Sequence, residues 1–151
     1  MFTGNAVYVV KTGAGKLTMG PGFAAPEGST INVNEGVFAM DAGMTAANLP
    51  SYLTIANGVK FTGEGVFGNV NLSVNDVVAP ALTTETDKTT EFTLLTATSI
   101  TGTSATMTDL LNEVNASDTK GKWKLVKKAA GGGAVALKCV YSKNAFVIVL
   151  R

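Results

Sequence analysis

The chain has 151 residues, of which 46% are hydrophobic and only 15% are charged, and its formal net charge is +1. A hydrophobic, weakly charged chain of this length is expected to fold, as one domain or as two small lobes. It contains no histidine and one cysteine, Cys139, which excludes histidine-based catalytic triads, zinc sites of cysteine and histidine, and an internal disulfide. Because Cys139 lies in an apolar run, we expect it to be a small core residue.

Targeting signals are not evident. No stretch reaches the roughly 18 apolar residues needed to cross a membrane, so no transmembrane segment is expected. The first residues lack the basic and apolar regions of a signal peptide. If the parent protein is exported, we therefore expect this chain to be a fragment or a processed product.

Residues 1–80 alternate short apolar segments with glycine, asparagine and aspartate. Residues 31–37 superpose on residues 53–59 with apolar positions and the glycine aligned, and residues 72–77 follow more loosely. The anchor positions recur at a spacing of about 20 residues, which is typical of solenoids. These anchors are Leu17, Val37, Val59 and Val77, and the last three are predicted to lie over one another in a column.

The recurrence has a direct physical interpretation. A strand with period-2 alternation buries one face, a glycine or asparagine takes positive φ at a corner, and stacked coils then share one core. We therefore predict a mainly β fold, with parallel β-helix coils over residues 1–80. The alternative is an antiparallel β-sandwich, whose strands also recur between turns.

The second part of the chain is predicted to form a small cap. Residues 81–91 are polar and unpatterned and are expected to form a loop, and residues 92–151 a C-terminal capping subdomain. One short helix is predicted over about 107–115, with Thr106 as its N-cap. Its apolar stripe consists of Leu110, Leu111 and Val114.

Three strands are predicted after this helix, over about 122–128, 134–141 and 145–150. The short joints between them favour antiparallel hairpins. The last strand is apolar on both faces, so we expect it to be a candidate edge strand that the body or another subunit covers. It consists of Phe146, Val147, Ile148, Val149 and Leu150.

Two stretches also match a known family pattern. Residues 11–19, Lys-Thr-Gly-Ala-Gly-Lys-Leu-Thr-Met, and residues 28–37, Gly-Ser-Thr-Ile-Asn-Val-Asn-Glu-Gly-Val, resemble the autotransporter-associated β-strand repeat. Residues 92–102 resemble the stretch that often follows the last coils of such proteins. Pro21 and Pro26 depart from the usual glycine- and asparagine-rich tract. The resemblance implies a right-handed parallel β-helix in an extracellular or cell-surface protein.

The carboxylates do not suggest an active site. Asp41, Glu64 and Asp76 occupy different phases of the repeat and are not expected to converge. Glu35, Asn57 and Asp76 form the single stacked polar column, which is more typical of turn capping than of a calcium site or of the paired carboxylates of a glycosidase. No catalytic, cofactor-binding or metal-binding residue is therefore assigned, and no cofactor is expected.

Charge is divided unevenly along the chain. Residues 1–119 hold all 11 acidic residues and four lysines, a net charge of −7, whereas residues 120–151 hold seven lysines, Arg151 and no acid, a net charge of +8. Strand alternation is expected to place Trp123 and Leu125 inside and the intervening lysines outside. The candidate interaction surface consists of Lys120, Lys122, Lys124, Lys127, Lys128, Lys138 and Lys143.

These features favour a non-catalytic structural module of a bacterial surface or secreted protein. We expect it to terminate a β-solenoid and to mediate assembly or adhesion, with itself as partner through head-to-tail or edge-strand contacts. An anionic-glycan-binding module is the alternative, and a fragment of a polysaccharide lyase or hydrolase is a further one. Nucleic acid is not expected as a partner, because exposed aromatic residues for base stacking are not indicated.

Overall fold

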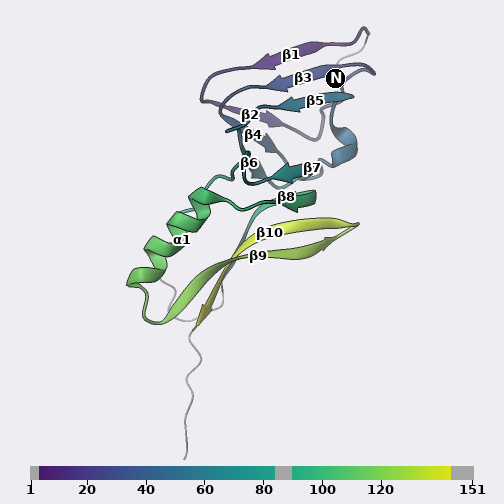
Figure 1. Cartoon of the computed structure of the whole chain (residues 1–151). Helices are drawn as coiled ribbons and strands as arrows, with labels where there is room; N and C mark the ends of the chain where they lie inside the picture. Colours follow the sequence, from purple (N-terminus) through teal and green to yellow (C-terminus); the bar gives the residue numbers. More distant parts are fainter. Residues whose placement is uncertain (1–3, 84–89, 144–151) are drawn as a thin grey trace, which may run out of the picture.

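The structure, a computed structural model, describes residues 4–83 and 90–143 of the chain. This part is mainly β, as predicted, with ten strands in three sheets and one α-helix (Figure 1). The predicted edge strand at 145–150 and most of the predicted loop at 81–91 lie outside the described residues.

The first six strands alternate between two parallel sheets. The first sheet contains β1 (Tyr8–Lys11), β3 (Thr30–Val33) and β5 (Tyr52–Ile55). The second sheet contains β2 (Lys16–Met19), β4 (Val37–Met40) and β6 (Lys60–Gly63). Each segment of the chain thus contributes one strand to each sheet before the next segment is laid beside it (Figure 1).

The register confirms one part of the predicted repeat. Ile31 lies beside Leu53, and Val33 lies beside Ile55, which are the pairs that the sequence alignment brings together. The side chains of Ile31 and Val33 are buried, while Asn32 between them is partly exposed. Period-2 alternation therefore accounts for the inner and outer faces of this sheet.

The predicted column of Val37, Val59 and Val77 is wrong. Val37 lies beside Lys60, one position beyond Val59, and Val77 forms a bridge with Phe61. The register shifts because the corner between β5 and β6, at 56–59, is one residue longer than the corner between β3 and β4, at 34–36. The observed column in this sheet runs through Leu17, Phe38, Phe61 and Val77.

Glycine occupies the corners with positive φ, as predicted. Gly36 has φ of 83° and Gly58 has φ of 85°. A Cβ atom at Gly36 would clash with the turn of the preceding segment, since it would lie 2.7 Å from the carbonyl oxygen of Gly13 and closer still to that of Gly15. A Cβ atom at Gly58 would meet nothing within 4 Å. The first corner therefore needs glycine for close packing as well as for backbone conformation.

The third sheet joins the two parts of the chain. It has the strand order β7–β8–β10–β9, where β7 is Val66–Asn71, β8 is Glu91–Thr101, β10 is Ala134–Lys143 and β9 is Gly121–Gly131. β7 is parallel to β8, and the other two pairings are antiparallel. The predicted hairpin formed by the regions 122–128 and 134–141 is confirmed, and a strand from the first half of the chain extends its sheet.

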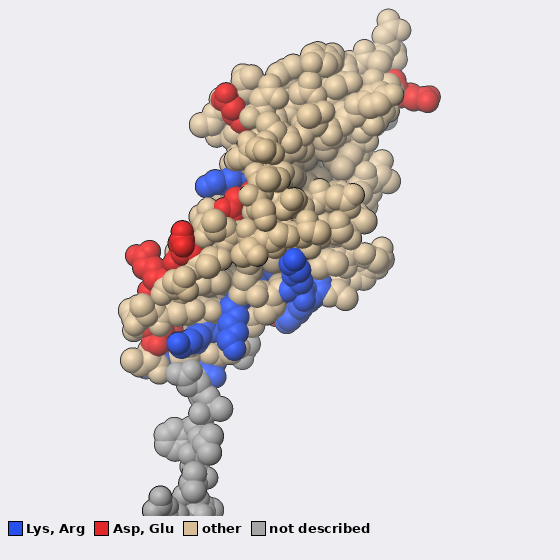
Figure 2. Space-filling model, viewed as in Figure 1, with Lys and Arg blue, Asp and Glu red and all other residues tan. Residues whose placement is uncertain are grey.

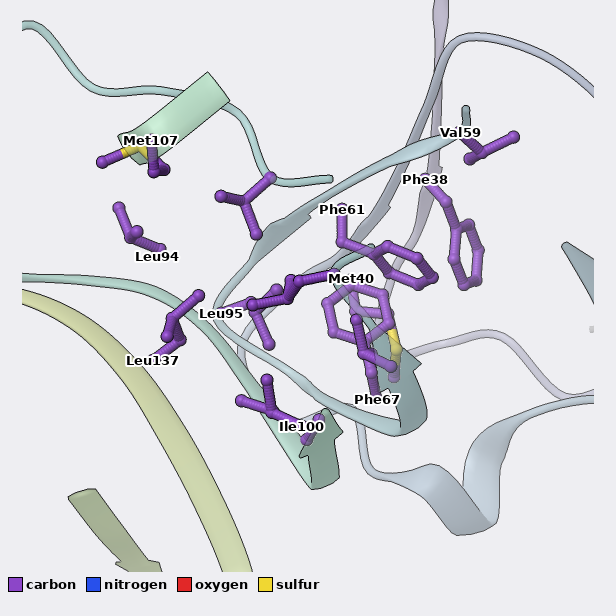
Figure 3. Close-up of a cluster of buried hydrophobic side chains, with 14 of the residues drawn as sticks. Phe38, Met40, Val59, Phe61, Phe67, Leu94, Leu95, Ile100, Met107 and Leu137 are labelled. Carbon is purple, nitrogen blue, oxygen red and sulfur yellow. The ribbon is translucent and has the colours of Figure 1, made fainter. Parts of the chain in front are cut away.

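The core is one continuous cluster. Phe38, Phe61 and Phe67 pack edge to face, with ring centroids 4.9 to 6.1 Å apart. Figure 3 shows these rings beside Met40, with Leu95, Ile100 and Leu137 continuing the cluster toward the third sheet. Because Phe67 belongs to β7, the aromatic group links the second parallel sheet to the third sheet.

The helix α1 (Ala105–Ser117) is two residues longer at each end than the predicted helix. Its N-cap is Ser104, whose hydroxyl accepts a hydrogen bond of 3.1 Å from the backbone N–H of Met107. The prediction of Thr106 as the cap is wrong, because Thr106 lies in the first turn and donates its N–H to the carboxylate of Asp76 at 3.2 Å. Met107 and Leu111 are the buried residues of the helix.

Asp76 ties this helix to the end of the first six strands. Its carboxylate also accepts from the hydroxyl of Ser104 and, at 2.8 Å, from the N–H of Val77. Burial acts to raise the pKa of Asp76, but the hydrogen bonds from Ser104, Thr106 and Val77 outweigh it, so that the pKa lies below its ordinary value. The ionised carboxylate therefore stabilises the folded chain.

An Asp76→Asn variant is expected to lose about 1 to 3 kcal/mol of unfolding free energy at neutral pH, since hydrogen bonds to a charged group are lost. Because folding lowers the pKa, the contribution is complete above the unfolded value of 3.8 and disappears as the pH falls below it. Urea titrations at neutral and acid pH should show the difference between variant and wild type shrinking in acid. Asp109→Asn, at an exposed site on the same helix, is the control; an equal effect of both substitutions would contradict the assigned role of Asp76.

Candidate functional site

The predicted lysines gather on the β9–β10 hairpin, and Figure 2 shows them over these strands in the lower half of the molecule. Lys124 lies opposite Val140, and Val126 lies opposite Lys138. Directly opposed residues of an antiparallel pair share a face, so several lysines project from one side of the hairpin. We call this side the lysine face; it carries Lys122, Lys124, Lys128 and Lys138.

The opposite side of the hairpin is anchored in the core by Trp123, which is 1% exposed. The side chain of Asn115 on α1 bonds both backbone groups of Trp123, at 2.7 and 2.9 Å, and the indole N–H donates to the carbonyl of Thr83 at 2.9 Å. Its ring stacks on Phe92 and contacts Tyr141, with centroids 5.6 and 5.2 Å apart. With Trp123 anchored inside, the neighbouring Lys122 and Lys124 are exposed on the other side of the strand.

The remaining three predicted lysines do not lie on this face. Lys127 is opposite the buried Leu137, on the other side of the hairpin, and its ammonium donates to the carbonyl of Ile100 at 2.9 Å. Lys120 and Lys143 are exposed near the open end of the hairpin, away from the glycine turn. The structure therefore brings together four of the seven predicted lysines on one face.

Glu91, at the start of β8, is the acidic residue that the sequence analysis missed. Its carboxylate pairs with Lys128 at 2.8 Å and with Lys138 at 2.5 Å. Hydrogen bonds from these two ammonium groups lower the pKa of Glu91 to about 2. Within residues 4–83 and 90–143, the other two lysines of this face, Lys122 and Lys124, form no ion pair.

A Glu91→Gln variant is expected to bind a heparin column more tightly and to elute at higher salt, because Lys128 and Lys138 lose their counter-charge. In the folded wild type, the pKa of Glu91 is depressed from 4.5. The ion pairs of Glu91 therefore stabilise the fold above pH 4.5, and this stabilisation is lost as the pH falls toward 2. An NMR titration of the Glu91 carboxyl checks this directly. A midpoint at the ordinary value, or unchanged elution of the variant, would contradict the pairing.

Two of the three candidate carboxylates do converge, contrary to the prediction. Asp41 and Glu64 line one shallow depression together with Lys16, directly after the paired strand ends Met40 and Gly63. The prediction failed because the sequence alignment set the two positions one residue out of step, whereas the longer corner before β6 brings them side by side. Both side chains are exposed.

The other polar positions have structural roles. Asp76 is held by α1, and the carboxylate of Glu35 accepts from the N–H of Gly13 at 2.7 Å, which is the turn-capping role expected for it. In the part of the chain that the structure describes, no group of three or more histidine, cysteine, aspartate or glutamate side chains is arranged to hold a metal ion. The buried Cys139 thiol has its pKa raised to about 11 by burial, so it is a core residue, as expected.

Comparison of the chain with family models, with curated proteins and with solved structures found no match. Among the described residues, no helix is long and apolar enough to cross a membrane.

Proposed function

We propose that the chain is a non-catalytic structural module of a secreted or cell-surface protein, in which a short parallel β-solenoid is terminated by a C-terminal cap. One observation carries the proposal: successive strands alternate between two parallel sheets, so that each segment is laid on the previous one with the short repeat typical of solenoids. The resemblance of residues 11–19 and 28–37 to the autotransporter-associated β-strand repeat supports the surface location and a right-handed path.

The two ends of this stack differ, which supports a terminating role. At the β6 end, the bridge between Phe61 and Val77 is followed by α1 and by the third sheet, and Asp76 joins the helix to the stack. Within the described residues β1, β2 and β5 each have one neighbouring strand, so the end that differs is that of β6, where the segment at 76–78 bonds to Phe61 on the outer side. A strand with one neighbour presents a row of unpaired N–H and C=O groups, which can accept another strand. The module thus covers one end of the stack and offers the other for assembly.

The open edge can be tested at Val10 in β1. The carbonyls of Val7 and Lys11 accept hydrogen bonds from Thr30 and Asn34 on the β3 side. Backbone groups alternate in direction along a parallel strand, so the N–H of Val10 points to the open edge. Proline at this position removes an edge donor without removing a bond to β3.

Light scattering of the purified chain at increasing concentration is expected to show self-association, and the Val10→Pro variant is expected to remain monomeric. Val10→Ala, which shortens the side chain but keeps the N–H, should associate like the wild type. If the wild-type chain stays monomeric at low and high salt, the proposal of self-assembly through this edge is wrong. Association that survives Val10→Pro would place the contact elsewhere.

A second candidate function is binding of an anionic glycan, and it is favoured by Lys122 and Lys124 on the lysine face, which form no ion pair with any residue that the structure describes. This function predicts binding to heparin that weakens with added salt and is lost when both residues become glutamate. The matched control replaces Lys16 and Lys60, in the first part of the chain, with glutamate, which makes the same change in net charge. Unchanged binding in the first variant would rule this function out.

A further inference from the structure

The outer face of the β1–β3–β5 sheet exposes two tyrosines. Tyr8 is 70% exposed and Tyr52 is 63% exposed, the two largest exposed fractions among the large hydrophobic side chains that the structure describes. The three strands run side by side at the top of Figure 1. We call this side the tyrosine face; it carries Tyr8, Val10, Thr30, Asn32, Tyr52 and Thr54.

The register sets the spacing of the two rings. Tyr8 lies beside Thr30, and Thr30 lies beside Tyr52, so the tyrosines occupy one row that crosses the three strands. Neighbouring strands are about 4.8 Å apart, which puts the two Cα atoms about 9 to 10 Å apart. Because Thr30 stands between them, the rings do not stack on each other, and their exposure is not explained by mutual packing.

A hydrogen bond orients the first ring. The side-chain N–H of Asn32, on the neighbouring strand, donates to the hydroxyl of Tyr8 at 2.8 Å. Asn32 is paired with Val10, two residues further along the strand than Tyr8, so this bond holds the Tyr8 side chain across toward β3. The Tyr8 side chain remains exposed while it is held in this way.

The chemistry of this face indicates the class of ligand. None of its six side chains is charged, and threonine and asparagine between the rings supply hydrogen-bond donors and acceptors. An anionic ligand has no cation to pair with here, and single-stranded nucleic acid needs a positively charged groove in addition to stacking rings. A neutral sugar chain fits these conditions, because its pyranose rings have apolar C–H faces for aromatic stacking and hydroxyls at their edges. In an extended β-linked hexose chain, alternate rings are separated by a distance comparable to that between the Cα atoms of the two tyrosines.

We propose that the tyrosine face binds a neutral, extended polysaccharide, with alternate sugar rings on Tyr8 and Tyr52 and hydroxyls on Asn32 and the threonines. This site is separate from the lysine face; it shares Tyr8 and Val10 with β1, but it uses their outward side chains, whereas the open edge of β1 uses backbone groups. It does not depend on the assembly state, so it can hold or fail independently of the proposed structural role.

The test is co-sedimentation of the full chain with insoluble cellulose, chitin and β-mannan, at low and high salt. We expect binding to at least one of these probes that does not weaken with salt. Tyr8→Ala and Tyr52→Ala should each weaken the binding about tenfold. Tyr52→Phe, which keeps the ring and removes a hydroxyl that does not orient it, should bind nearly as well as the wild type. Because both rings are exposed, the urea unfolding midpoints of all variants should remain near that of the wild type.

Phe92→Ala is the control, since it removes a partly exposed aromatic ring from another part of the surface. It should leave binding unchanged. Binding to none of the three probes would overturn the proposal, and so would binding that persists after both tyrosines are replaced. Binding that disappears at high salt, or with Lys122 and Lys124 replaced, would assign the ligand to the lysine face instead.

Discussion

Replacing Gly36 with alanine is expected to destabilise the chain by about 3 kcal/mol or more, whereas the same replacement at Gly58 should cost only about 1 to 2 kcal/mol. Both glycines have nearly the same positive φ, so both substitutions carry the conformational cost. Only at Gly36 would the new Cβ atom also press on the backbone of the turn at Gly13–Gly15. The difference between the two variants isolates the close contact between successive segments.

Urea unfolding of the two variants, followed by circular dichroism, measures this difference. Gly58 is the matched control, because it occupies the equivalent position of the next repeat and has no atom within 4 Å of an added Cβ. If the two variants lost the same amount of unfolding free energy, Gly36 would not lie as close to the turn at Gly13–Gly15 as it does in the structure. That result would also weaken the stacked arrangement on which the proposed function depends.

The Phe61→Ala variant is expected to lose about 3 to 5 kcal/mol, as is usual for truncation of a buried phenylalanine. Phe61 is 4% exposed and lies between Phe38 and Phe67, with ring centroids 6.1 and 4.9 Å away. Its replacement leaves a cavity where the second parallel sheet meets β7. Because the aromatic group links two sheets, we expect one unfolding transition for the whole chain, shifted to lower denaturant.

Phe92→Ala is the control for size and chemistry, since Phe92 is 39% exposed although it stacks on Trp123. It should cost about 1 kcal/mol, the contribution of an aromatic pair near the surface. Within each variant, the fluorescence of Trp123 and circular dichroism should give the same unfolding midpoint as each other. Two separate transitions in Phe61→Ala would show that the two parts of the chain fold independently and that the core is not shared.

The strand pattern of the repeats could be predicted from the sequence, but the register could be predicted only in part. Residues 31–33 and 53–55 were aligned correctly, because both strands carry the same alternation. Glycine at positions 36 and 58 was also expected to take positive φ, since this property is local. The alignment fails just beyond these glycines because the second corner has one more residue than the first. A local pattern of apolar residues does not show at which residue the strand after a longer corner begins to pair.

The lysine face was predictable to the extent that it depends on strand alternation. Trp123 points inward and Lys122 and Lys124 outward, as period 2 requires. The pairing of Glu91 with Lys128 could not be predicted, because the two residues are 37 positions apart and meet only when β8, β10 and β9 assemble into one sheet. The choice of Ser104 over Thr106 as helix cap has the same origin, since both residue types suit an N-cap and the contact with Asp76 decides between them.

The unequal corners bear on how such a chain tolerates insertions and deletions. The corner between β5 and β6 holds an extra residue, yet the strands on both sides remain paired with their neighbours. An added residue inside a strand would instead turn each following inward side chain toward solvent. Length variation should therefore accumulate at exposed corner positions such as Asn57 and Gly58, which makes this corner the natural place to graft a foreign loop for display.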